Sequence, residues 1–141
     1  MTEPKIHVTK DAGEIGLAVM LADLMRQNME QKPYKRLHFG LLDARVCIRA
    51  PDIEVEITLH FERGECTIHP GQVGRPDISV VADADDILKL SLVKVKWGLP
   101  DFLDEAGIDV LKRILSGKVR IEGLLRHFVG VQLLTVVLSV Y

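Results

Sequence analysis

The stretch that decides the fold lies in the middle of the chain and reads Ile53-Glu54-Val55-Glu56-Ile57-Thr58-Leu59-His60-Phe61-Glu62. Five apolar residues alternate strictly with five polar ones along it. Because successive side chains of a β-strand point to opposite faces of the sheet, this alternation predicts a strand with one buried face and one face in water. Sheets that are wet on one face are commonly antiparallel, so we expect antiparallel neighbours on both sides.

Two turns predict how the neighbouring segments pair with this strand. Arg63-Gly64 reads as a two-residue turn after it, and Pro51-Asp52 as a two-residue turn before it. When residues are counted outward from these turns, one face of the unit is apolar throughout and the charged side chains gather on the other. The predicted pairs are Phe61 with Cys66, Leu59 with Ile68, Ile48 with Val55, Val46 with Ile57, and Ala44 with Leu59.

The two cysteines of the chain fall on opposite faces of this unit. The register places Cys47 on the polar face and Cys66 on the apolar face. A disulfide needs Cβ atoms roughly 3.8 Å apart, which side chains on opposite faces of one sheet do not reach. We therefore expect two free thiols, and the sequence has no Cys-x-x-Cys motif or Cys/His cluster that would indicate a zinc site.

Helical spacing dominates the segments around these strands. From 11 to 31 the apolar residues recur every three or four positions, and Lys32-Pro33 ends the pattern. Asp11 with Glu14 resembles a capping box, and Lys35-Arg36 reads as a charge pair in the following loop. The remaining predicted elements are a fourth strand ending at 82, helices over 84–117 with a break at 97–100, a strand over 118–122 and a helix over 124–140.

This order of elements predicts an α+β domain. Four strands within 44–82 and the strand at 118–122 form a five-stranded, mainly antiparallel sheet, and the helices pack on one of its faces. The chain has 141 residues, of which 48% are hydrophobic, 27% charged and 5% aromatic. These proportions suit one domain over 1–141 with a core of its own.

Charge and the N-terminal segment exclude further classes. The chain has 18 basic and 20 acidic residues and a net charge of −2, which argues against a protein that binds a phosphate backbone through clustered cations. Nucleic acid is therefore not an expected partner. The start of the chain lacks a basic region followed by an apolar stretch, so we predict no secretory signal and expect a reducing, cytoplasmic location.

The last fourteen residues, from Phe128 to Tyr141, carry no charge. They are too few to span a bilayer as a helix, which needs roughly 20 apolar residues. Apolar residues surround the axis of the predicted helix, whereas a surface helix needs only one apolar stripe. Something apolar must cover more than one face. It is the core, the wall of a lipid cavity, a homodimer interface or a transient contact with a membrane surface.

No arrangement typical of catalysis is present in the sequence. Nucleophile-elbow and Walker signatures are absent, and acidic pairs such as Asp85-Asp86 read as charges at helix starts or on wet faces. His60, Glu62 and His69 fall on one face of the sheet. That face is wet and lacks a pre-organised third ligand, which favours an ordinary exposed pair of histidines over a metal site. We expect no enzyme activity, no metal and no cofactor.

Three motifs in order carry a family resemblance. They are Pro76-Asp77-Ile78-Ser79-Val80, Ala82-Asp83-Ala84-Asp85-Asp86-Ile87-Leu88, and Ser116-Gly117-Lys118-Val119-Arg120-Ile121-Glu122-Gly123 before an apolar helix. From Arg45 to the end, the chain resembles the sterol carrier protein type-2 domain family, whose order of elements also matches. The segment from 90 to 115 is longer than the usual connection in that family.

The resemblance implies a non-catalytic domain that holds an acyl, sterol or isoprenoid chain in a hydrophobic cavity between sheet and helices. Helical facing and family analogy assign eleven residues to the ligand. They are Leu88, Leu92, Phe102, Leu103, Leu111, Ile114, Leu115, Phe128, Val131, Leu134 and Leu138. The alternative is a scaffold or accessory module that binds partner proteins, as in lipid-soluble quinone biosynthesis, or that dimerises through the C-terminal helix.

Overall fold

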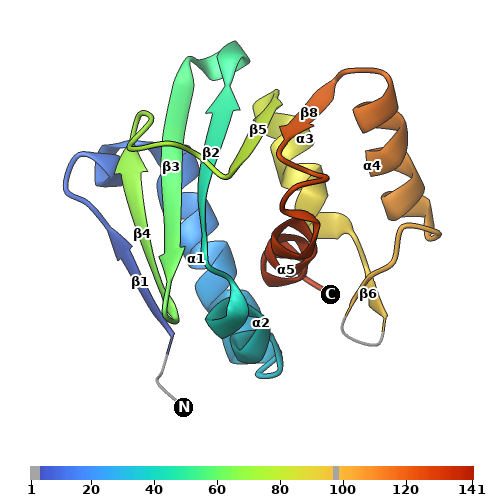
Figure 1. Cartoon of the computed structure of the whole chain (residues 1–141), viewed down its shortest axis with the longest axis horizontal. Coiled ribbons are helices and arrows are strands. Elements are labelled where there is room, and N and C mark those ends of the chain that lie inside the picture. The colour runs from blue at the N-terminus through green and yellow to red at the C-terminus, as the bar shows by residue number, and fades with distance from the viewer. Residues whose placement is uncertain (1–3, 97–98) are drawn as a thin grey trace.

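The computed structural model describes residues 4–96 and 99–141, and its centre is a sheet against which helices pack (Figure 1). The strands are β1 (Lys5–Val8), β2 (Ala44–Ala50), β3 (Val55–Glu62), β4 (Glu65–Pro70), β5 (Ile78–Ala82), β6 (Val95–Lys96), β7 (Leu99–Pro100) and β8 (Val119–Glu122). The helices are α1 (Gly16–Gln31), α2 (Lys35–Leu41), α3 (Ala84–Lys89), α4 (Glu105–Leu115) and α5 (Phe128–Leu138). The predicted α+β class is confirmed.

The large sheet has six strands in the order β1-β4-β3-β2-β5-β8 and is mixed. β1 runs parallel to β4 and β5 runs parallel to β2, while the other neighbours are antiparallel. The prediction of five mainly antiparallel strands is therefore wrong in number and partly wrong in direction. The missing strand, β1, has four residues and pairs Lys5 with Glu65 far along the chain, a pairing that local periodicity does not reveal.

The parallel pairing of β5 with β2 follows from a crossing loop. Residues 71–77 leave β4, cross the outer face of β3 and β2, and enter β5 on the far side. The Thr58 hydroxyl holds this loop, because it donates to the carbonyl of Gly71 at 2.7 Å and accepts from the amide of Val73 at 3.0 Å. The loop accounts for the burial of Thr58 and Cys47 on the face predicted to be wet.

The β3–β4 hairpin has the predicted register, with Leu59 opposite Ile68 and Phe61 opposite Cys66. Cys66 is buried on the apolar face, Cys47 lies on the opposite face, and both are free thiols, as predicted. Burial raises the pKa of the Cys66 thiol, which keeps the group neutral. The thiol therefore serves as a small apolar group of the core.

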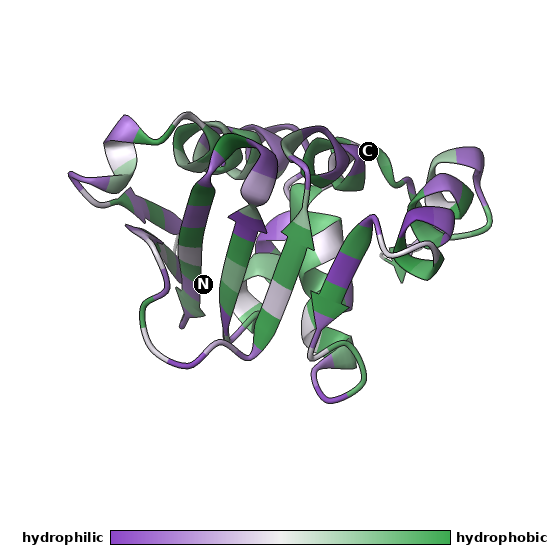
Figure 2. Ribbon diagram, turned by 90° about the horizontal axis from the view of Figure 1, so that it is seen from above, coloured by the Kyte–Doolittle hydropathy of each residue, from purple (hydrophilic) through white to green (hydrophobic). Residues whose placement is uncertain are grey.

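The β2–β3 register differs from the predicted one by two residues, since Ile48 lies opposite Ile57. The turn uses four residues instead of two. Pro51–Ile53 form a 3-10 turn, and Glu54 follows in the left-handed conformation with φ 54°. A slip of two keeps every side chain on its predicted face. The strands accordingly alternate between hydrophobic and hydrophilic residues (Figure 2).

α1 packs its apolar side against the sheet and ends at Gln31, before the predicted stop at Lys32-Pro33. It begins at Gly16 instead of position 11, because Ile15 is extended and separates α1 from a 3-10 turn over Ala12–Glu14. The side chain of Asp11 makes no capping hydrogen bond, so the predicted capping box is wrong.

α2 occupies the segment that was expected to be a loop. Its seven residues span too few turns to show a helical period in the sequence. Phe39 packs edge-on against Phe61 of β3, with ring centroids 5.8 Å apart. Lys35 is fully buried, so the prediction that it belongs to a loop charge pair is wrong.

The helical region after β5 is divided by non-helical residues. α3 starts at Ala84 and continues as a 3-10 turn over Leu90–Leu92, followed by the small β6–β7 pair. Of the break predicted over 97–100, residues 97 and 98 lie outside the described residues, and Leu99–Pro100 form β7. Asp86 of α3, predicted as a first-turn acid, is buried, and its Oδ1 lies 2.5 Å from Nη1 of Arg113 in α4. This ion pair joins the two helices.

α4 lies at the end of the molecule beyond β8 (Figure 1). Its cap is Asp104, whose carboxylate accepts from the amide of Ala106 at 3.4 Å. The last strand, β8, begins and ends close to its predicted limits. α5 begins at Phe128 rather than 124, because residues 123–127 form turns. A Cβ atom at Gly123 would lie 2.2 Å from the Asp77 carbonyl, so this turn requires glycine.

Candidate functional site around the last helix

α5 is apolar all round, and the structure surrounds its two ends differently. Along the side facing the sheet, Val131, Leu134 and Leu138 belong to the hydrophobic core. At the C-terminal end every residue from 136 to 139 is buried, whatever its direction. At the N-terminal end Phe128 is 55% exposed and Val129 69% exposed. The helix is therefore core at one end and surface at the other.

Two buried polar side chains hold the C-terminal end of α5. The last four carbonyls of a helix have no partner within the helix. The Asn28 side-chain amide of α1 donates to the carbonyl of Val137 at 2.9 Å, and the Lys35 ammonium of α2 donates to the carbonyl of Ser139. The Ser139 hydroxyl donates to the Val93 carbonyl. We call Asn28, Lys35 and Ser139 the C-terminal anchor.

The buried position of Lys35 in the anchor lowers the pKa of its side chain. Its side chain is fully buried, and burial lowers the pKa of its ammonium from 10.5 to about 8, with a smaller contribution from the positive charge of Lys32. Near neutral pH the group remains mostly protonated. It then offers a charged donor to the carbonyl of Ser139, which strengthens this hydrogen bond.

An apolar groove runs beside the exposed end of α5. It lies between α2 and α5, is closed at one side by β7, and has a volume of about 260 Å³. Its lining is Leu37, His38, Leu41, Leu99, Phe128, Val129, Gln132 and Leu133. A second hollow of about 480 Å³ adjoins it, since the two share Leu41, Phe128, Val129 and Leu133. Both open to solvent along the same stretch of α5.

The hollows described next are more polar than the apolar groove. One of about 830 Å³ lies between the 3-10 turn after α3 and α4, and charged side chains dominate its lining. They are Lys89, Lys94, Asp104, Glu105, Asp109 and Lys112, with Leu92, Ala106, Ile108 and Tyr141 between them. This lining does not suit an aliphatic chain, because desolvating several charged groups is costly.

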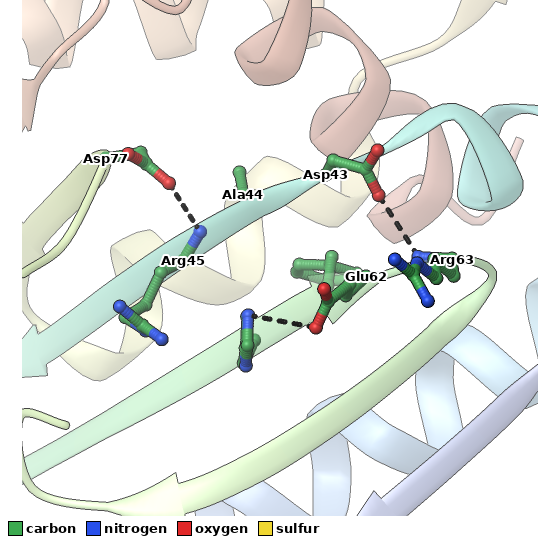
Figure 3. Close-up of a pocket in the computed structure, with 8 residues that line it drawn as sticks. Asp43, Ala44, Arg45, Glu62, Arg63 and Asp77 are labelled. Carbon is green, nitrogen blue, oxygen red and sulfur yellow. Dashed lines mark hydrogen bonds and ion pairs between the residues drawn. The ribbon is translucent and has the colours of Figure 1, made fainter. Parts of the chain in front are cut away.

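A fourth hollow lies beside the start of β2 and the end of β3 (Figure 3). Its acids mostly hold the backbone. The Asp77 carboxylate accepts from the amide of Arg45 at 2.9 Å, and the Asp43 carboxylate accepts from the amide of Arg63 at 3.1 Å. Oε2 of Glu62 lies 3.8 Å from Nε2 of His60. Within 4–96 and 99–141, no three His, Cys, Asp or Glu side chains are grouped to hold a metal ion.

The eleven residues assigned to the ligand fall into three places. Those in or against the core are Val131, Leu134, Leu138 and Ile114. Those that line a hollow are Phe128, in the apolar groove, and Leu92, in the charged hollow. The others are Leu88 and Phe102, which are half-buried, and Leu103, Leu111 and Leu115, which are exposed. The structure brings together the α5 members and leaves those near α4 at a separate place.

Sequence reasoning missed the part of the groove that α2 supplies. Leu37 and Leu41 are spaced four apart, and Lys35 and Phe39 are spaced four apart on the buried side, but two such pairs in seven residues are too few to predict a helix. It also missed the C-terminal anchor. Asn28 sits within a helical pattern where a polar residue normally indicates the solvent side, and no sequence signal marks it.

No helix among the described residues has the length and apolar character needed to cross a bilayer. Comparison with sequences gives no relative, since no protein-family model and no curated protein matches the chain. Comparison with solved structures finds proteins of similar fold. The chain superimposes on a "UbiJ-SCP2 Ubiquinone synthesis protein" with a TM-score of 0.60 and 17% identity, over 86% of this chain and 91% of that chain.

A second similar structure is described as "Crystal structure of sterol carrier protein 2". It matches with a TM-score of 0.52 and 12% identity, over 86% of this chain and 92% of that chain. Likeness at such identities concerns the fold, because one fold serves many functions. The chain has the sterol carrier protein type-2 fold that its motifs resemble.

Proposed function

We propose that this domain binds a hydrophobic molecule with an acyl, sterol or isoprenoid chain between its sheet and helices, and carries or presents it without chemical change. One observation carries the proposal: an apolar groove opens beside α5 in a fold shared with a sterol carrier protein. The lining of the groove is hydrocarbon apart from His38 and Gln132. Such a lining suits a ligand recognised by shape and desolvation.

Desolvation alone supplies enough free energy for this function. At about 0.8 kcal/mol per buried CH₂ group, a C16 chain offers roughly 10 kcal/mol before the costs of ordering it. That allows micromolar binding with no specific polar contact. Ligand pockets usually measure about 300–1,000 Å³. The groove of about 260 Å³ is slightly too small, and together with its neighbour of about 480 Å³ it falls within that range.

The N-terminal half of α5 is the wall that gives way to the ligand in this proposal. The C-terminal anchor fixes the other end of the helix, whereas Phe128 and Val129 are exposed and have no such tie. A chain entering between α2 and α5 would meet Phe128 first, then Val131 and Leu134 on the side toward the sheet. The predicted residues near α4 would reach the ligand only if α4 closed over α5.

Titration with a fluorescent fatty acid tests the proposal. We expect saturable binding, and we expect Phe128→Ala to raise the Kd about tenfold, because the ligand would lose its contact with an aromatic ring that lines the groove, and with it about 1.4 kcal/mol of transfer free energy. Ile53→Ala is the matched control, since Ile53 is 47% exposed, lies in the turn before β3 and lines none of the hollows described above. Absence of saturable binding, together with no lipid in a solvent extract of the purified protein, would overturn it.

A second candidate is an accessory module that binds protein partners or a second copy of itself. It is favoured by the higher TM-score of the match to a protein described as a ubiquinone synthesis protein. Native mass spectrometry of freshly purified protein separates the two functions. A carrier gives adducts with the mass of a lipid, whereas an accessory module gives bare protein or a bare oligomer.

A further inference from the structure

Two adjoining hollows beside the start of α5 differ in polarity. The apolar groove is lined by hydrocarbon apart from His38 and Gln132. The hollow of about 480 Å³ next to it, which we call the middle hollow, shares four apolar residues with the groove and also contains Asp43, Arg126 and His127 in its lining. The lining therefore changes from apolar to mixed in one direction, from α2 and β7 toward the start of β2.

Polarity rises further beyond the middle hollow. The hollow beside the start of β2 and the end of β3 shares Asp43 and Ala44 with it. Apart from Ala44 and Phe61, every residue that lines this next hollow is charged or is a histidine. Nε2 of His127, in the middle hollow, lies 3.9 Å from Oδ1 of Asp77, in the polar one. The three hollows thus form a row with hydrocarbon at one end and charged side chains at the other.

The two charged residues of the middle hollow are Asp43 and Arg126, and both are exposed. Oδ1 of Asp43 accepts from the amide of Arg63 at 3.1 Å. Within 4–96 and 99–141, Oδ2 of Asp43 and the guanidinium of Arg126 have no partner, in each other or elsewhere. The middle hollow therefore offers an acceptor and a donor to a group that fills it, with one negative and one positive charge.

We infer that the middle hollow holds the polar head of the ligand, and that this head is uncharged and carries a hydroxyl group. The inference rests on the proposed function, in which the hydrophobic chain lies in the apolar groove. A hydroxyl group both donates and accepts hydrogen bonds, so it suits a site with a carboxylate oxygen and a guanidinium to satisfy. A carboxylate head would be repelled by Asp43, and an ammonium head by Arg126.

Displacement of the fluorescent fatty acid by four C16 compounds tests the inference on the full chain. The compounds are hexadecanol, its methyl ether, palmitate and hexadecylamine. The ether is more apolar than the alcohol, so it would bind more tightly if desolvation alone decided the affinity. We expect the alcohol to bind about threefold more tightly than the ether, because only the alcohol donates a hydrogen bond to Asp43.

Two variants that remove a charge locate the head. Asp43→Asn keeps an oxygen that accepts from the amide of Arg63. It should raise the affinity for palmitate relative to hexadecylamine about threefold, and Arg126→Gln should lower this ratio about threefold, since exposed charges interact weakly. Asp23→Asn and Arg75→Gln are the matched controls, because both residues are exposed and line none of the hollows described above.

All four variants change an exposed side chain, so their thermal unfolding temperatures should stay close to that of the wild type. An ether that binds as tightly as the alcohol would overturn the inference. So would variants at 43 and 126 that shift the palmitate ratio no more than the controls do. In either case saturable binding of the fluorescent fatty acid leaves the proposed function standing, whereas its absence overturns the proposed function and the head site together.

Discussion

The two ends of α5 have similar composition and opposite surroundings. At the C-terminal end, α1 and α2 supply Asn28 and Lys35 to the helix carbonyls, and the apolar side chains between these bonds are buried. At the N-terminal end, Phe128 and Val129 are as apolar but lie at a solvent-exposed groove. The difference teaches that polar partners, rather than apolar composition, decide which end of this helix belongs to the core.

The largest expected effect comes from a pair of substitutions, one at each end. Leu138→Ala should lower the free energy of unfolding by about 3 kcal/mol, because it leaves a cavity in the core. Val129→Ala should change it by no more than about 0.5 kcal/mol, because that side chain is mostly in water. Urea unfolding measures both. Similar losses for the two variants would remove the contrast between the ends.

A smaller effect should follow from removing one member of the C-terminal anchor. Asn28→Ala leaves the Val137 carbonyl buried without its donor and should cost about 1.5 kcal/mol. Gln27→Ala is the control, since Gln27 is the neighbour of Asn28 in α1 and is exposed. If both variants unfold at the same urea concentration, the Asn28 bond does not hold α5.

The smallest expected effect concerns pH. The pKa of Lys35 is about 8 in the folded protein and about 10.5 in an unfolded chain, so the unfolded chain binds more protons between these values. Lys35 therefore adds stability as pH rises through this window and adds no pH dependence well below 8. One proton changes the free energy of unfolding by at most about 1.4 kcal/mol per pH unit.

The comparison of Lys35→Ala with the wild type isolates this effect, because contributions of the cysteines to alkaline stability cancel in the difference. The variant should be less stable at both pH 7 and pH 9, with a wider gap at pH 9. Chemical unfolding at the two pH values measures it. A gap that is constant or narrows at pH 9 would contradict the lowered pKa.

Strict local patterns allowed the centre of the fold to be predicted from the sequence. The alternation gave the right face for the side chains of β3 and, with a two-residue turn, the right register of β3 with β4, whereas Ile53, predicted to be buried, lies in the turn before β3 and is 47% exposed. The prediction of a two-residue turn between β2 and β3 was wrong, because Glu54 adopts a left-handed conformation that is uncommon for a glutamate. A shift of two residues leaves each side chain on the same face of the sheet, so the predicted apolar face of β2 and β3 is correct.

What the sequence left out depends on contacts between distant segments. β1 is a strand because it pairs with β4, about 60 residues further along the chain. The direction of β5 is determined by the loop that crosses the outer face of the sheet. In the anchor, Lys35 donates to the carbonyl of Ser139, near the other end of the chain. The site shows the same limit. The apolar character of α5 was visible in the sequence, while the α2 side of the groove was not, since a seven-residue helix has too little period to detect.

Amide hydrogen exchange along α5, with and without a C16 fatty acid, tests the central claim most directly. Without ligand, amides from 135 to 139 should exchange slowly and those from 131 to 134 faster, because the anchor holds only the C-terminal end. The fatty acid should slow exchange at 131–134 and leave 135–139 nearly unchanged. Equal protection of both halves, with no change on adding the fatty acid, would contradict a helix that is held at one end and receives a hydrophobic chain at the other.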